Sequence, residues 1–578
     1  MRITVGKGSC GIAACAGEVF DRLTASLAGS GVEVAATGCV GACYLEPIVN
    51  AYGEFGEKTF ARVGPKAADE IAKFARGLPN AARRYALKPE DARVLTGRES
   101  VALARCGAID PESIDDYLKT GGYEAIRKCV SERSPEDVIA EIKASGLSGR
   151  GGAGFSTAFK WQAARDAKGG PKYVICNADE GDPGAFMDRA LIEGDPHAIL
   201  EGMMIGAYAI GARHGIVYVR AEYPLAIHRL KRAIADATAR GFLGEGAFSG
   251  AFPFEVRIKA GAGAFVCGEE TALIASLEGE RGMPRLRPPY PAQSGYLKRP
   301  SNINNVETYA NVPWILRHGG EAFAAMGTEN SKGTKVFALA GKVKNGGLAE
   351  VQMGRTIRDV VYGIGGGIKG GKAFKAVQMG GPSGGCIPES LADTPIDYKS
   401  LAATGAIMGS GGMVVMDEET CMVDMARFFL DFTCKESCGK CTHCRVGNRR
   451  MLEILERICA GEGVEGDVER LSELALRIKD GALCALGQTA PNPVLTTIRY
   501  FREEYDAHIR DKRCQAKQCK ALLTYTIDED KCLGCTMCAT KCPGKAIAGE
   551  FKKPHRIDPA KCTKCGGCAE LCHLVSAR

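Results

Sequence analysis

Closely spaced cysteines dominate this chain, which has 26 of them among 578 residues. Many are separated by only two to four other residues, the spacing with which thiolates hold a metal ion or an iron–sulfur cluster. The opening MRITVGKGSC lacks the long apolar run of a secretory signal, and no stretch reaches the ~20 apolar residues of a membrane span. We therefore expect a cytosolic (cytoplasmic) protein with no membrane span, whose reduced thiols ligate metal.

Length and charge narrow the function classes further. A chain of 578 residues exceeds the size at which one core stops growing, so we expect about three to five domains. The 75 Lys and Arg against 68 Asp and Glu give a formal charge of +7, too small to indicate nucleic-acid binding. Residues 511–578 hold 13 basic and 7 acidic side chains, so +6 of that charge lies there. This C-terminal segment suits an acidic protein partner.

The pattern along the chain predicts a multidomain α/β protein. Strands are expected at 2–5, 173–176 and 254–259, and Ser134 is expected to cap a helix that ends near Ala144. The expected boundaries are an N-terminal cysteine domain (1–80), a linker (81–130), an α/β domain (131–325), a domain of short strands (333–416), a helical bundle (417–510) and a cysteine-rich tail (511–578).

The tail carries one cysteine spacing twice, C-x2-C-x2-C-x3-C, with Pro543 after the first copy and His573 in the proline's place after the second. The doubled motif resembles bacterial two-[4Fe-4S] ferredoxins, with zinc as the alternative. In that family the fourth cysteine of each copy crosses to the other cluster. The resemblance thus implies one [4Fe-4S] cluster on Cys532, Cys535, Cys538 and Cys572, and another on Cys542, Cys562, Cys565 and Cys568.

Two further groups suit iron–sulfur clusters, again with zinc as the alternative. SCGKCTHC supplies Cys438, Cys441 and Cys444, and Cys484 in GALCALG is the natural fourth ligand for a third [4Fe-4S] cluster. Near the N-terminus, a C-x4-C and a C-x3-C suit two irons and resemble thioredoxin-like [2Fe-2S] ferredoxins. The ligands of that [2Fe-2S] cluster would be Cys10, Cys15, Cys39 and Cys43.

A zinc site is expected where the tail begins. Cys514 and Cys519 form another C-x4-C, and Cys459 and His555 could complete a Cys3His set that joins the tail to the helical bundle. Unliganded thiols are the alternative. The remaining cysteines are expected to be buried free thiols: Cys106, Cys129, Cys176, Cys267, Cys386, Cys421 and Cys434.

Two glycine-rich segments suggest a bound phosphate, flavin or nucleotide. GRGGAGF (149–155) follows a helix rather than a strand, which opposes a conventional dinucleotide fold but still suits a flavin. GAGAFVCG (261–268) leads from a strand into a helix that starts at Glu269 and Glu270, where backbone N–H groups could bind polar ligand atoms. The two glutamates could equally just complement the helix dipole.

Six segments in family order resemble the NADH-binding flavoprotein subunit of respiratory complex I. They are GRGGAGF (149–155), CNADEGDPG (176–184), GAGAFVCGEET (261–271), PAQSG (291–295), INNVET (303–308) and SCGKCTHC (437–444). The resemblance covers roughly residues 130–505. It implies an FMN site built from Gly149, Arg150, Gly151, Gly152, Lys160, Asn177, Asp179, Glu180, Gly268, Glu269, Asn304 and Asn305.

The same resemblance implies that NADH stacks beside Phe155, with Asp182, Glu270 and Tyr290 nearby. Glu180 and Glu270 would be the catalytic groups, positioning the nicotinamide and tuning the flavin. Three residues depart from the family: Asp182 stands where glutamate is usual, Tyr290 where phenylalanine is usual, and Arg287 where lysine is common. The choice between NAD and NADP therefore stays open.

The cysteine-rich flanks make the chain similar to the flavin subunit of electron-bifurcating [FeFe]-hydrogenases, NADP-reducing hydrogenases and NAD-linked formate dehydrogenases. That resemblance implies a β-grasp domain at 333–416. It also implies a hetero-oligomer with a catalytic hydrogenase or formate dehydrogenase subunit, a small [2Fe-2S] subunit and ferredoxin. Hydride would pass between NAD(H) and FMN, and single electrons through the clusters. An iron–sulfur electron-wiring scaffold without a flavin, or a redox sensor, would be alternatives of another class.

Overall fold

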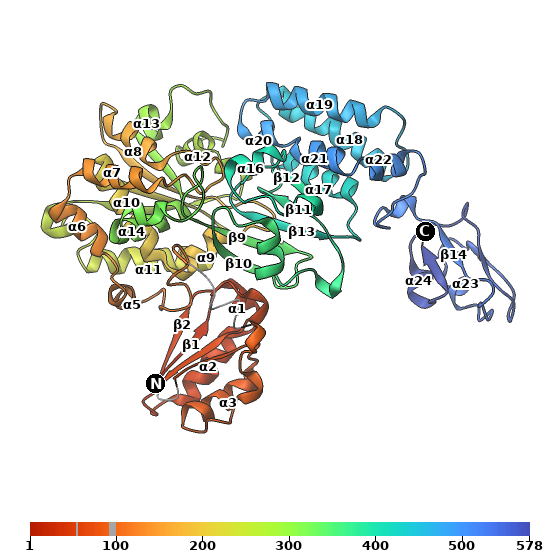
Figure 1. Cartoon of the computed structure of the whole chain (residues 1–578), viewed down its shortest axis with the longest axis horizontal. Coiled ribbons are helices and arrows are strands. Elements are labelled where there is room, and N and C mark those ends of the chain that lie inside the picture. The colour runs from red at the N-terminus through yellow and green to blue at the C-terminus, as the bar shows by residue number, and fades with distance from the viewer. Residues whose placement is uncertain (54–55, 92–99, 578) are drawn as a thin grey trace. The chain divides into compact units, whose positions relative to one another are not determined.

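The computed structural model describes residues 1–53, 56–91 and 100–577 (Figure 1). By contacts, the chain forms two compact units. One consists of residues 1–372 and 377–415, and the other of residues 373–376 and 416–578. Within the described ranges, no helix combines the length and the apolar character needed to cross a bilayer.

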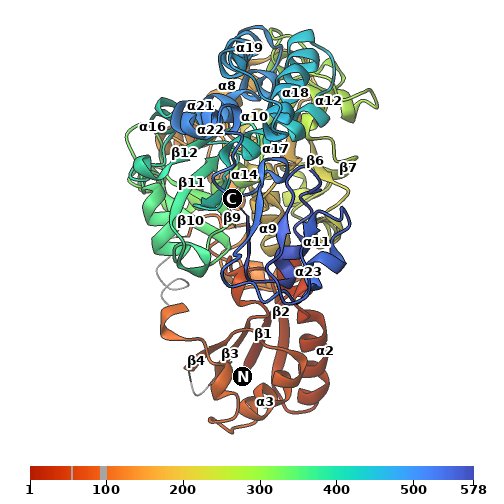
Figure 2. The same ribbon diagram turned by 90° about the vertical axis from the view of Figure 1, so that its right-hand side faces the viewer.

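The first unit begins with a four-stranded sheet in the order β2-β1-β3-β4 (Figure 2). Its strands are β1 (Arg2–Gly6), β2 (Glu33–Thr37), β3 (Val49–Gly53) and β4 (Gly56–Phe60). β1 runs parallel to β2, and the other pairs are antiparallel. Helices α2 (Ala16–Leu27) and α3 (Pro65–Ala75) bury Val19, Leu23 and Ile71 against Ile3 and Val5, while α1 (Ser9–Ala13) carries the first cysteine. The expected strand at 2–5 is confirmed.

A second sheet, in the order β7-β6-β5-β8, is parallel throughout. Its strands are β5 (Tyr173–Ala178), β6 (His214–Arg220), β7 (Glu255–Gly261) and β8 (Ser301–Asn305). The chain reaches β6 and β7 on one side of β5 and then returns to the other side as β8. The sheet therefore has a topological switch point between β5 and β8, where open α/β sheets usually bind ligands.

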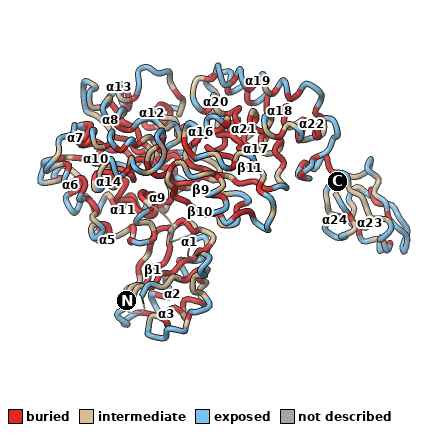
Figure 3. Tube along the Cα trace, viewed as in Figure 1, coloured by how far each residue is buried: buried red, intermediate tan, exposed pale blue. Residues whose placement is uncertain are grey.

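Helices cover this parallel sheet. They are α7 (Pro135–Ser145), α8 (Thr157–Asp166), α9 (Met187–Gly194), α10 (Pro196–Ile210), α11 (Pro224–Ala239), α12 (Glu270–Leu277), α13 (Pro291–Ser294), α14 (Val306–His318) and α15 (Gly320–Ala324). α10 is buried at nearly every position (Figure 3). Ser134 and Asp137 form a capping box at the start of α7, so the helix expected after Ser134 is confirmed.

Residues 101–130 correct the expected linker, because they belong to the core of this unit. Val101, Leu103 and Tyr117 are buried, as are most of the apolar residues of α6 (Glu124–Glu132), and α5 (Ile114–Lys119) lies in the same segment. Buried carboxylates from distant elements hold its backbone. Glu350 accepts hydrogen bonds from the N–H groups of residues 101–103 at 2.8–2.9 Å, and Glu201 accepts from those of residues 123, 125 and 126 at 3.0–3.3 Å.

A third, mixed sheet follows in the order β10-β9-β13-β11-β12. Its strands are β9 (Thr334–Gly341), β10 (Gly347–Gln352), β11 (Phe374–Met379), β12 (Gly385–Pro388) and β13 (Gly412–Asp417), and α16 (Tyr398–Ala403) precedes β13. β9 pairs antiparallel with β10 and parallel with β13. The β-grasp assignment of this region stays a prediction.

The second unit contains the expected helical segment and the cysteine-rich tail. Its helices are α17 (Met422–Lys435), α18 (Asn448–Cys459), α19 (Asp467–Gly481), α20 (Ala485–Thr489), α21 (Asn492–Tyr500) and α22 (Arg502–Ile509). They share a core that includes Leu430, Met451, Leu455 and Leu471. The tail has the helices α23 (Met537–Lys541) and α24 (Gly567–Leu571) and the strands β14 (Tyr525–Ile527), β15 (Ile547–Ala548), β16 (Arg556–Ile557) and β17 (Val575–Ala577).

Candidate functional site

Three of the sequence motifs meet at the carboxyl edge of the parallel sheet. CNADE ends β5, GAGAFVCG follows β7, and INNVET ends β8. Asn177 and Asn305 are register partners at the ends of β5 and β8, so they flank the switch point. Ligands of open α/β sheets bind in the crevice outside these strand ends. The fold thus gathers segments from residues 176 to 308 at one edge of the sheet.

The GRGGAGF loop borders this crevice and depends on its glycines. A Cβ atom on Gly151 would lie 3.2 Å from the Cβ of Asn305. Gly152 and Gly154 have φ angles of +121° and +65°, and a Cβ there would meet backbone of Gly409 at 2.9 Å and the ring of Tyr398 at 2.6 Å. Glycine at these positions therefore lets the loop pack closely against Asn305 at the end of β8 and against the segments that carry Gly409 and Tyr398.

Arg150 corrects one expectation about the cofactor. Its side chain is fully buried and points into the protein, where the guanidinium donates hydrogen bonds to the carbonyls of Thr334 at 3.0 Å, Ser148 at 2.9 Å and Lys332 at 2.6 Å. A guanidinium bonded in this way supports the loop from behind. The backbone N–H of Arg150 also bonds within the protein, donating to the Thr308 hydroxyl at 2.9 Å.

Asparagines fix the loops around the crevice. The Asn177 side chain donates to the carbonyl of Gly268 at 2.9 Å and accepts from the N–H of Asp179 at 3.0 Å, which joins the loop after β5 to the loop before α12. The carbonyl oxygen of the Asn304 side chain accepts from the indole of Trp161 at 2.9 Å. Asn305 donates to the Asp188 carboxylate at 2.6 Å. These expected site residues therefore hold the crevice in shape.

Glu180 caps a helix. Its carboxylate accepts hydrogen bonds from the N–H groups of Asp188 at 3.0 Å and Arg189 at 3.1 Å, in the first turn of α9, and from the Tyr223 hydroxyl at 3.3 Å. Burial raises the pKa of Glu180. With both oxygens occupied, this side chain ties the loop after β5 to α9, and a direct catalytic role for it remains a prediction.

The two glutamates at the start of α12 do different things. Glu269 is the helix N-cap, and its carboxylate accepts hydrogen bonds from the N–H groups of Thr271 and Ala272 at 2.9 and 3.0 Å. It therefore stabilises the start of α12, the structural alternative to ligand binding for these glutamates. Glu270 instead forms ion pairs with Lys160 at 3.0 Å and Arg287 at 2.8 Å.

Burial raises the pKa of Glu270, but Lys160 and Arg287 outweigh it and leave that pKa below its ordinary value. Lys160 also donates to the carbonyl of Ile303 at 2.7 Å, at the end of β8. The three charged side chains therefore form a compact group with one net positive charge beside the crevice.

Exposed aromatic rings lie beside this charged group. Phe155, Phe159 and Tyr290 are 54%, 64% and 53% exposed, unusual values for large apolar side chains. The rings of Phe155 and Phe159 meet edge to face at 5.5 Å. Phe159 was not among the site residues expected from the sequence. Its place on α8, one residue before the expected site residue Lys160, could have indicated that it lies near the site. The rings offer stacking surfaces for the planar parts of a nucleotide.

Asp182 is turned toward the third sheet. The Ser410 hydroxyl donates to its carboxylate at 2.6 Å, and a Cβ on Gly381 would lie 2.7 Å from the same group. Burial raises the pKa of Asp182 to about 6, although the hydrogen bond from Ser410 opposes that shift. The Asp182 side chain, which is shorter than the glutamate usual in the family, is thus fixed by Ser410 and by the close approach of Gly381.

Comparison with known proteins agrees with this arrangement. Residues 142–314 match the Nuo51 FMN-binding domain, residues 424–508 the NADH-ubiquinone oxidoreductase-F iron-sulfur binding region, and residues 524–573 a 4Fe-4S dicluster domain. NADP-reducing hydrogenase subunit HndC of Solidesulfovibrio fructosivorans is 58% identical over 455 residues, which cover 79% of this chain and 92% of the relative. An F-type subunit of the NADH-quinone oxidoreductase of Rhizobium meliloti is 45% identical over 72% of this chain and 99% of its own length.

The chain belongs to the family of F-type subunits of NADH-quinone oxidoreductase. It is an oxidoreductase subunit of the NADH dehydrogenase type, as its motifs predicted. A solved NAD+-reducing [NiFe]-hydrogenase in the H2-reduced state matches with a TM-score of 0.64 and 30% identity, covering 88% of this chain and 84% of the other. The resemblance stated from the sequence is confirmed.

In this member of the family, the helical part of the second unit brings one expected group of thiols together. Cys444 is buried, and its pKa is raised to about 11 by burial and by the neighbouring thiols of Cys441, Cys484 and Cys438, against a hydrogen bond with Ser437. A Cβ on Gly487 would lie 3.1 Å from the Cβ of Cys444, so the turn of α20 packs directly on this group.

The tail of this oxidoreductase subunit groups its cysteines across the two motif copies. Cys542 of the first copy lines a small cavity together with Cys562, Cys565 and Cys568 of the second. Conversely, Cys572 of the second copy is close enough to Cys538 to raise the pKa of that thiol, after burial itself. This crossed arrangement matches the one implied for two [4Fe-4S] clusters.

Near the N-terminus, the ligand atoms of Cys10, Cys39 and Cys43 lie within 4.8 Å of one another. Cys15 is exposed at the N-cap of α2 and lies outside this group. Glu46 is the carboxylate beside them, with its Oε1 3.9 Å from the Cys10 sulfur, and burial raises the pKa of Glu46 to about 8. The structure thus brings three of the four expected ligands together.

Helix α9 connects these N-terminal thiols with the crevice. Its first turn holds Glu180 and Asp188 at the strand ends, and Glu193 near its last turn bonds to Ser9. Gly194 closes the helix against Gly38, where a Cβ would lie 2.4 Å from the Gly194 backbone. One helix of eight residues therefore touches both sites.

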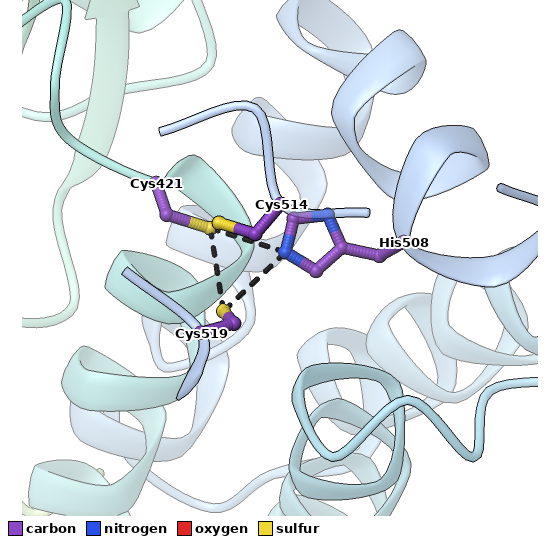
Figure 4. Close-up of side chains that lie close together, drawn as sticks. All are labelled: Cys421, His508, Cys514 and Cys519. Carbon is purple, nitrogen blue, oxygen red and sulfur yellow. Dashed lines mark hydrogen bonds between the residues drawn. The ribbon is translucent and has the colours of Figure 1, made fainter. Parts of the chain in front are cut away.

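The expected zinc set is partly wrong. Cys514 and Cys519 do come together, but their partners are Cys421 and His508, and all four ligand atoms lie within 4.8 Å of one another in a fully buried group (Figure 4). Cys421 Sγ lies 3.4 Å from His508 Nε2 and 3.8 Å from Cys519 Sγ, and His508 Nε2 lies 3.4 Å from Cys519 Sγ.

His555 lies outside this group. Cys459, at the end of α18, is not one of the four mutually close donors, but its thiol forms a hydrogen bond with that of Cys519 and so lies beside the group. His555 is buried within the tail, where its backbone N–H donates to the Cys532 sulfur at 3.4 Å. Cys421, expected as a free thiol, is the N-cap of α17 and thereby reaches the loop after α22. Spacing alone could not reveal a partner 98 residues away from Cys519.

The orientation of His508 suits metal binding. Its Nδ1 lies 2.7 Å from the carbonyl oxygen of Glu504, which can only accept, so Nδ1 carries the proton. Nε2 is then left with its lone pair toward the three sulfur atoms. A metal-ligating histidine usually has its other nitrogen fixed in this way.

Proposed function

We propose that this chain exchanges hydride with NAD(H) at an FMN in the crevice between β5 and β8 and passes single electrons through iron–sulfur clusters. The observation that carries this proposal is one polypeptide that places a glycine-rich loop at the switch point of its parallel sheet and also holds several compact groups of thiols. FMN, when bound, takes two electrons as a hydride and releases them one at a time.

The residues of the chain would act by binding and orientation. The loop with Gly151 and Gly152 would border the ring, since its glycines bring it close to Asn305 at the switch point, and the asparagines at the strand ends keep the loops in place. Phe155 and Phe159 offer exposed faces for the nicotinamide dinucleotide. Lys160 and Arg287 hold Glu270 ionised and leave one net positive charge toward the nucleotide phosphates.

Three [4Fe-4S] clusters and one [2Fe-2S] cluster are proposed on the thiol groups described above. The N-terminal [2Fe-2S] cluster requires Cys15 to join Cys10, Cys39 and Cys43. A zinc ion is proposed on Cys421, His508, Cys514 and Cys519, a donor set that zinc accepts in structural sites. There it would tie the start of the tail to α17 and α22.

We further propose a hydrogenase complex as the assembly, with a catalytic subunit, a small [2Fe-2S] subunit and ferredoxin, and with electron bifurcation. This is supported by the 58% identical relative, named as a subunit of an NADP-reducing hydrogenase, and by the similar NAD+-reducing [NiFe]-hydrogenase. The alternative assembly is an NAD-linked formate dehydrogenase. Because the 58% identical relative is named as a subunit of an NADP-reducing hydrogenase, NADPH should be tested beside NADH.

The test uses full-length chain, prepared anaerobically with its clusters and incubated with FMN. We expect stoichiometric FMN that remains after gel filtration, bleaching of the iron–sulfur absorbance by NADH or NADPH, and viologen reduction. A wiring scaffold would keep its clusters yet bind no FMN and show no bleaching. That result would overturn the proposal.

A further inference from the structure

The two cysteine repeats of the tail differ in the side chains between their cysteines. Leu533 and Met537 lie between cysteines of the first copy, where the second has Thr563 and Gly567. Leu533 is 84% exposed and Met537 is 56% exposed. The first copy therefore presents more apolar surface to solvent beside its thiols than the second copy, whose Leu571 is 46% exposed.

A third apolar side chain, Phe551, joins this surface and is 69% exposed. The N–H of Lys552 donates to the carbonyl of Gly534 at 2.9 Å, which holds the segment around Phe551 against the one around Leu533. Gly534 has a φ of +67°, and a Cβ there would lie 2.3 Å from the Lys553 nitrogen, so this close packing requires glycine. We call Leu533, Met537 and Phe551 the apolar patch.

Basic side chains border the apolar patch. Lys541 follows Met537 by four residues on α23 and so shares its face of the helix. The Lys552 ammonium lies 5.6 Å from the centroid of the Phe551 ring. Among the described residues, the ion pairs in this part of the tail involve other cations, and neither Lys541 nor Lys552 is within ion-pair distance of a carboxylate.

The two copies differ in how their lysines are used. At the position of Lys541 the second copy has Leu571, preceded by the acidic Glu570. The lysine within the second copy, Lys564, donates to the Ala521 carbonyl, whereas Lys552 lies over the Phe551 ring of the apolar patch. The positive charge beside the patch therefore has no counterpart at the same place in the second copy.

We propose that the apolar patch, with Lys541 and Lys552, is the docking surface for a small acidic iron–sulfur protein. It would exchange electrons with the cluster on Cys532, Cys535, Cys538 and Cys572, so this inference rests on the proposed function. One electron leaves the reduced cluster and reduces the oxidised centre of the partner, or passes in the reverse direction, and no atom or proton is transferred. A small apolar contact within a charged rim suits a transient electron-transfer encounter.

The experiment compares three variants with the wild-type chain, each as the full chain loaded with its cofactors. The patch variant is Leu533→Ser with Phe551→Ser, the charge variant is Lys541→Gln with Lys552→Gln, and the control is Leu571→Ser with Lys520→Gln. Binding of a gallium-substituted acidic two-cluster ferredoxin to each immobilised form is measured first. Electron exchange with the native ferredoxin and NADH–viologen activity are then measured at low and high salt.

We expect the patch and charge variants to bind the ferredoxin about tenfold more weakly, with cluster content and viologen activity at wild-type levels. The salt dependence of binding should fall in the charge variant only. Ferredoxin binding equal to that of wild type in both variants would overturn the docking surface. Absence of NADH–viologen activity in the wild-type chain would instead overturn the proposed function. Viologen activity without any ferredoxin binding would overturn the docking surface alone.

Discussion

Ser9 gives Glu193 two hydrogen bonds, one from its backbone N–H at 2.8 Å and one from its hydroxyl at 2.6 Å. Ser9 directly precedes Cys10, and the Glu193 side chain is almost completely buried. This pair fastens the start of α1, which carries the first thiol, to the end of α9.

Replacing Glu193 should loosen the start of α1. In Glu193→Ala the N–H and hydroxyl of Ser9 lose their acceptor in a partly buried place, which costs about 1 kcal/mol. We expect faster hydrogen exchange of residues 7–13, measured by mass spectrometry. Glu33→Ala, at an exposed carboxylate on β2, is the matched control and should change nothing there. Equal exchange in both variants would contradict the anchoring role.

The zinc ligands can be tested by metal content. Cys421→Ser and His508→Gln should each remove the zinc from the full chain, because three donors hold the ion far more weakly than four. His555→Gln, at an expected ligand that lies in the tail outside the group, should keep it. Mass spectrometry of the metals measures all three variants. Zinc lost from His555→Gln and kept by Cys421→Ser and His508→Gln would reject the site in Figure 4.

Asp182 should make stability depend on pH. Burial raises its folded pKa to about 6, above that of the unfolded chain, so ionisation costs stability as pH rises from the unfolded pKa through the folded one. Asp182→Asn removes that cost while its amide oxygen still accepts from Ser410. The gain in stability should increase by about 1 kcal/mol between pH 5 and pH 7.5.

Thermal unfolding of the FMN-free chain at the two pH values measures this gain. Asp393→Asn is the control, since its carboxylate is exposed and paired with Arg358. A gain for Asp182→Asn that is independent of pH would show that the carboxyl group does not titrate in this range.

Arg287 should matter for nucleotide binding. Arg287→Gln removes one of the two cations that hold Glu270, which weakens the attraction for the nucleotide phosphates and leaves the Glu270 charge less compensated. We expect KM for NADH and NADPH to rise about tenfold, with the larger rise for NADPH because of its extra phosphate. Steady-state kinetics with viologen provide the measurement.

Arg213→Gln, at the residue just before β6 and hence at the opposite end of the sheet, is the control for that experiment. A KM unchanged by Arg287→Gln would place the nucleotide elsewhere.

Local signals predicted the elements of the fold well. The capping box of Ser134 and Asp137 marks the start of α7, and Glu269 marks the start of α12, because both features act within one turn of helix. The expected helical bundle likewise follows from short spacings in the sequence, whereas the crossed cysteine arrangement of the tail was implied by the resemblance to two-cluster ferredoxins.

Contacts between distant residues explain what the sequence could not predict. Residues 101–130 look polar enough for a linker. Their backbone N–H groups, however, donate hydrogen bonds to the carboxylates of Glu350 and Glu201, which lie more than 70 residues away in the sequence. Cys421 becomes a neighbour of His508 only because α17 and α22 pack together, and the side chain of Arg150 turns inward because carbonyls of Thr334 and Lys332 surround it.

Helix α9 sets one distance in the proposed electron path. Its eight residues span about 12 Å, with the strand ends of the parallel sheet at one end and the N-terminal thiols at the other. Because a helix is stiff and both of its ends are bonded, an FMN and a [2Fe-2S] cluster bound as proposed would have their separation built into the backbone. Their exchange would then proceed at a rate independent of solvent viscosity, with no hinge to wait for.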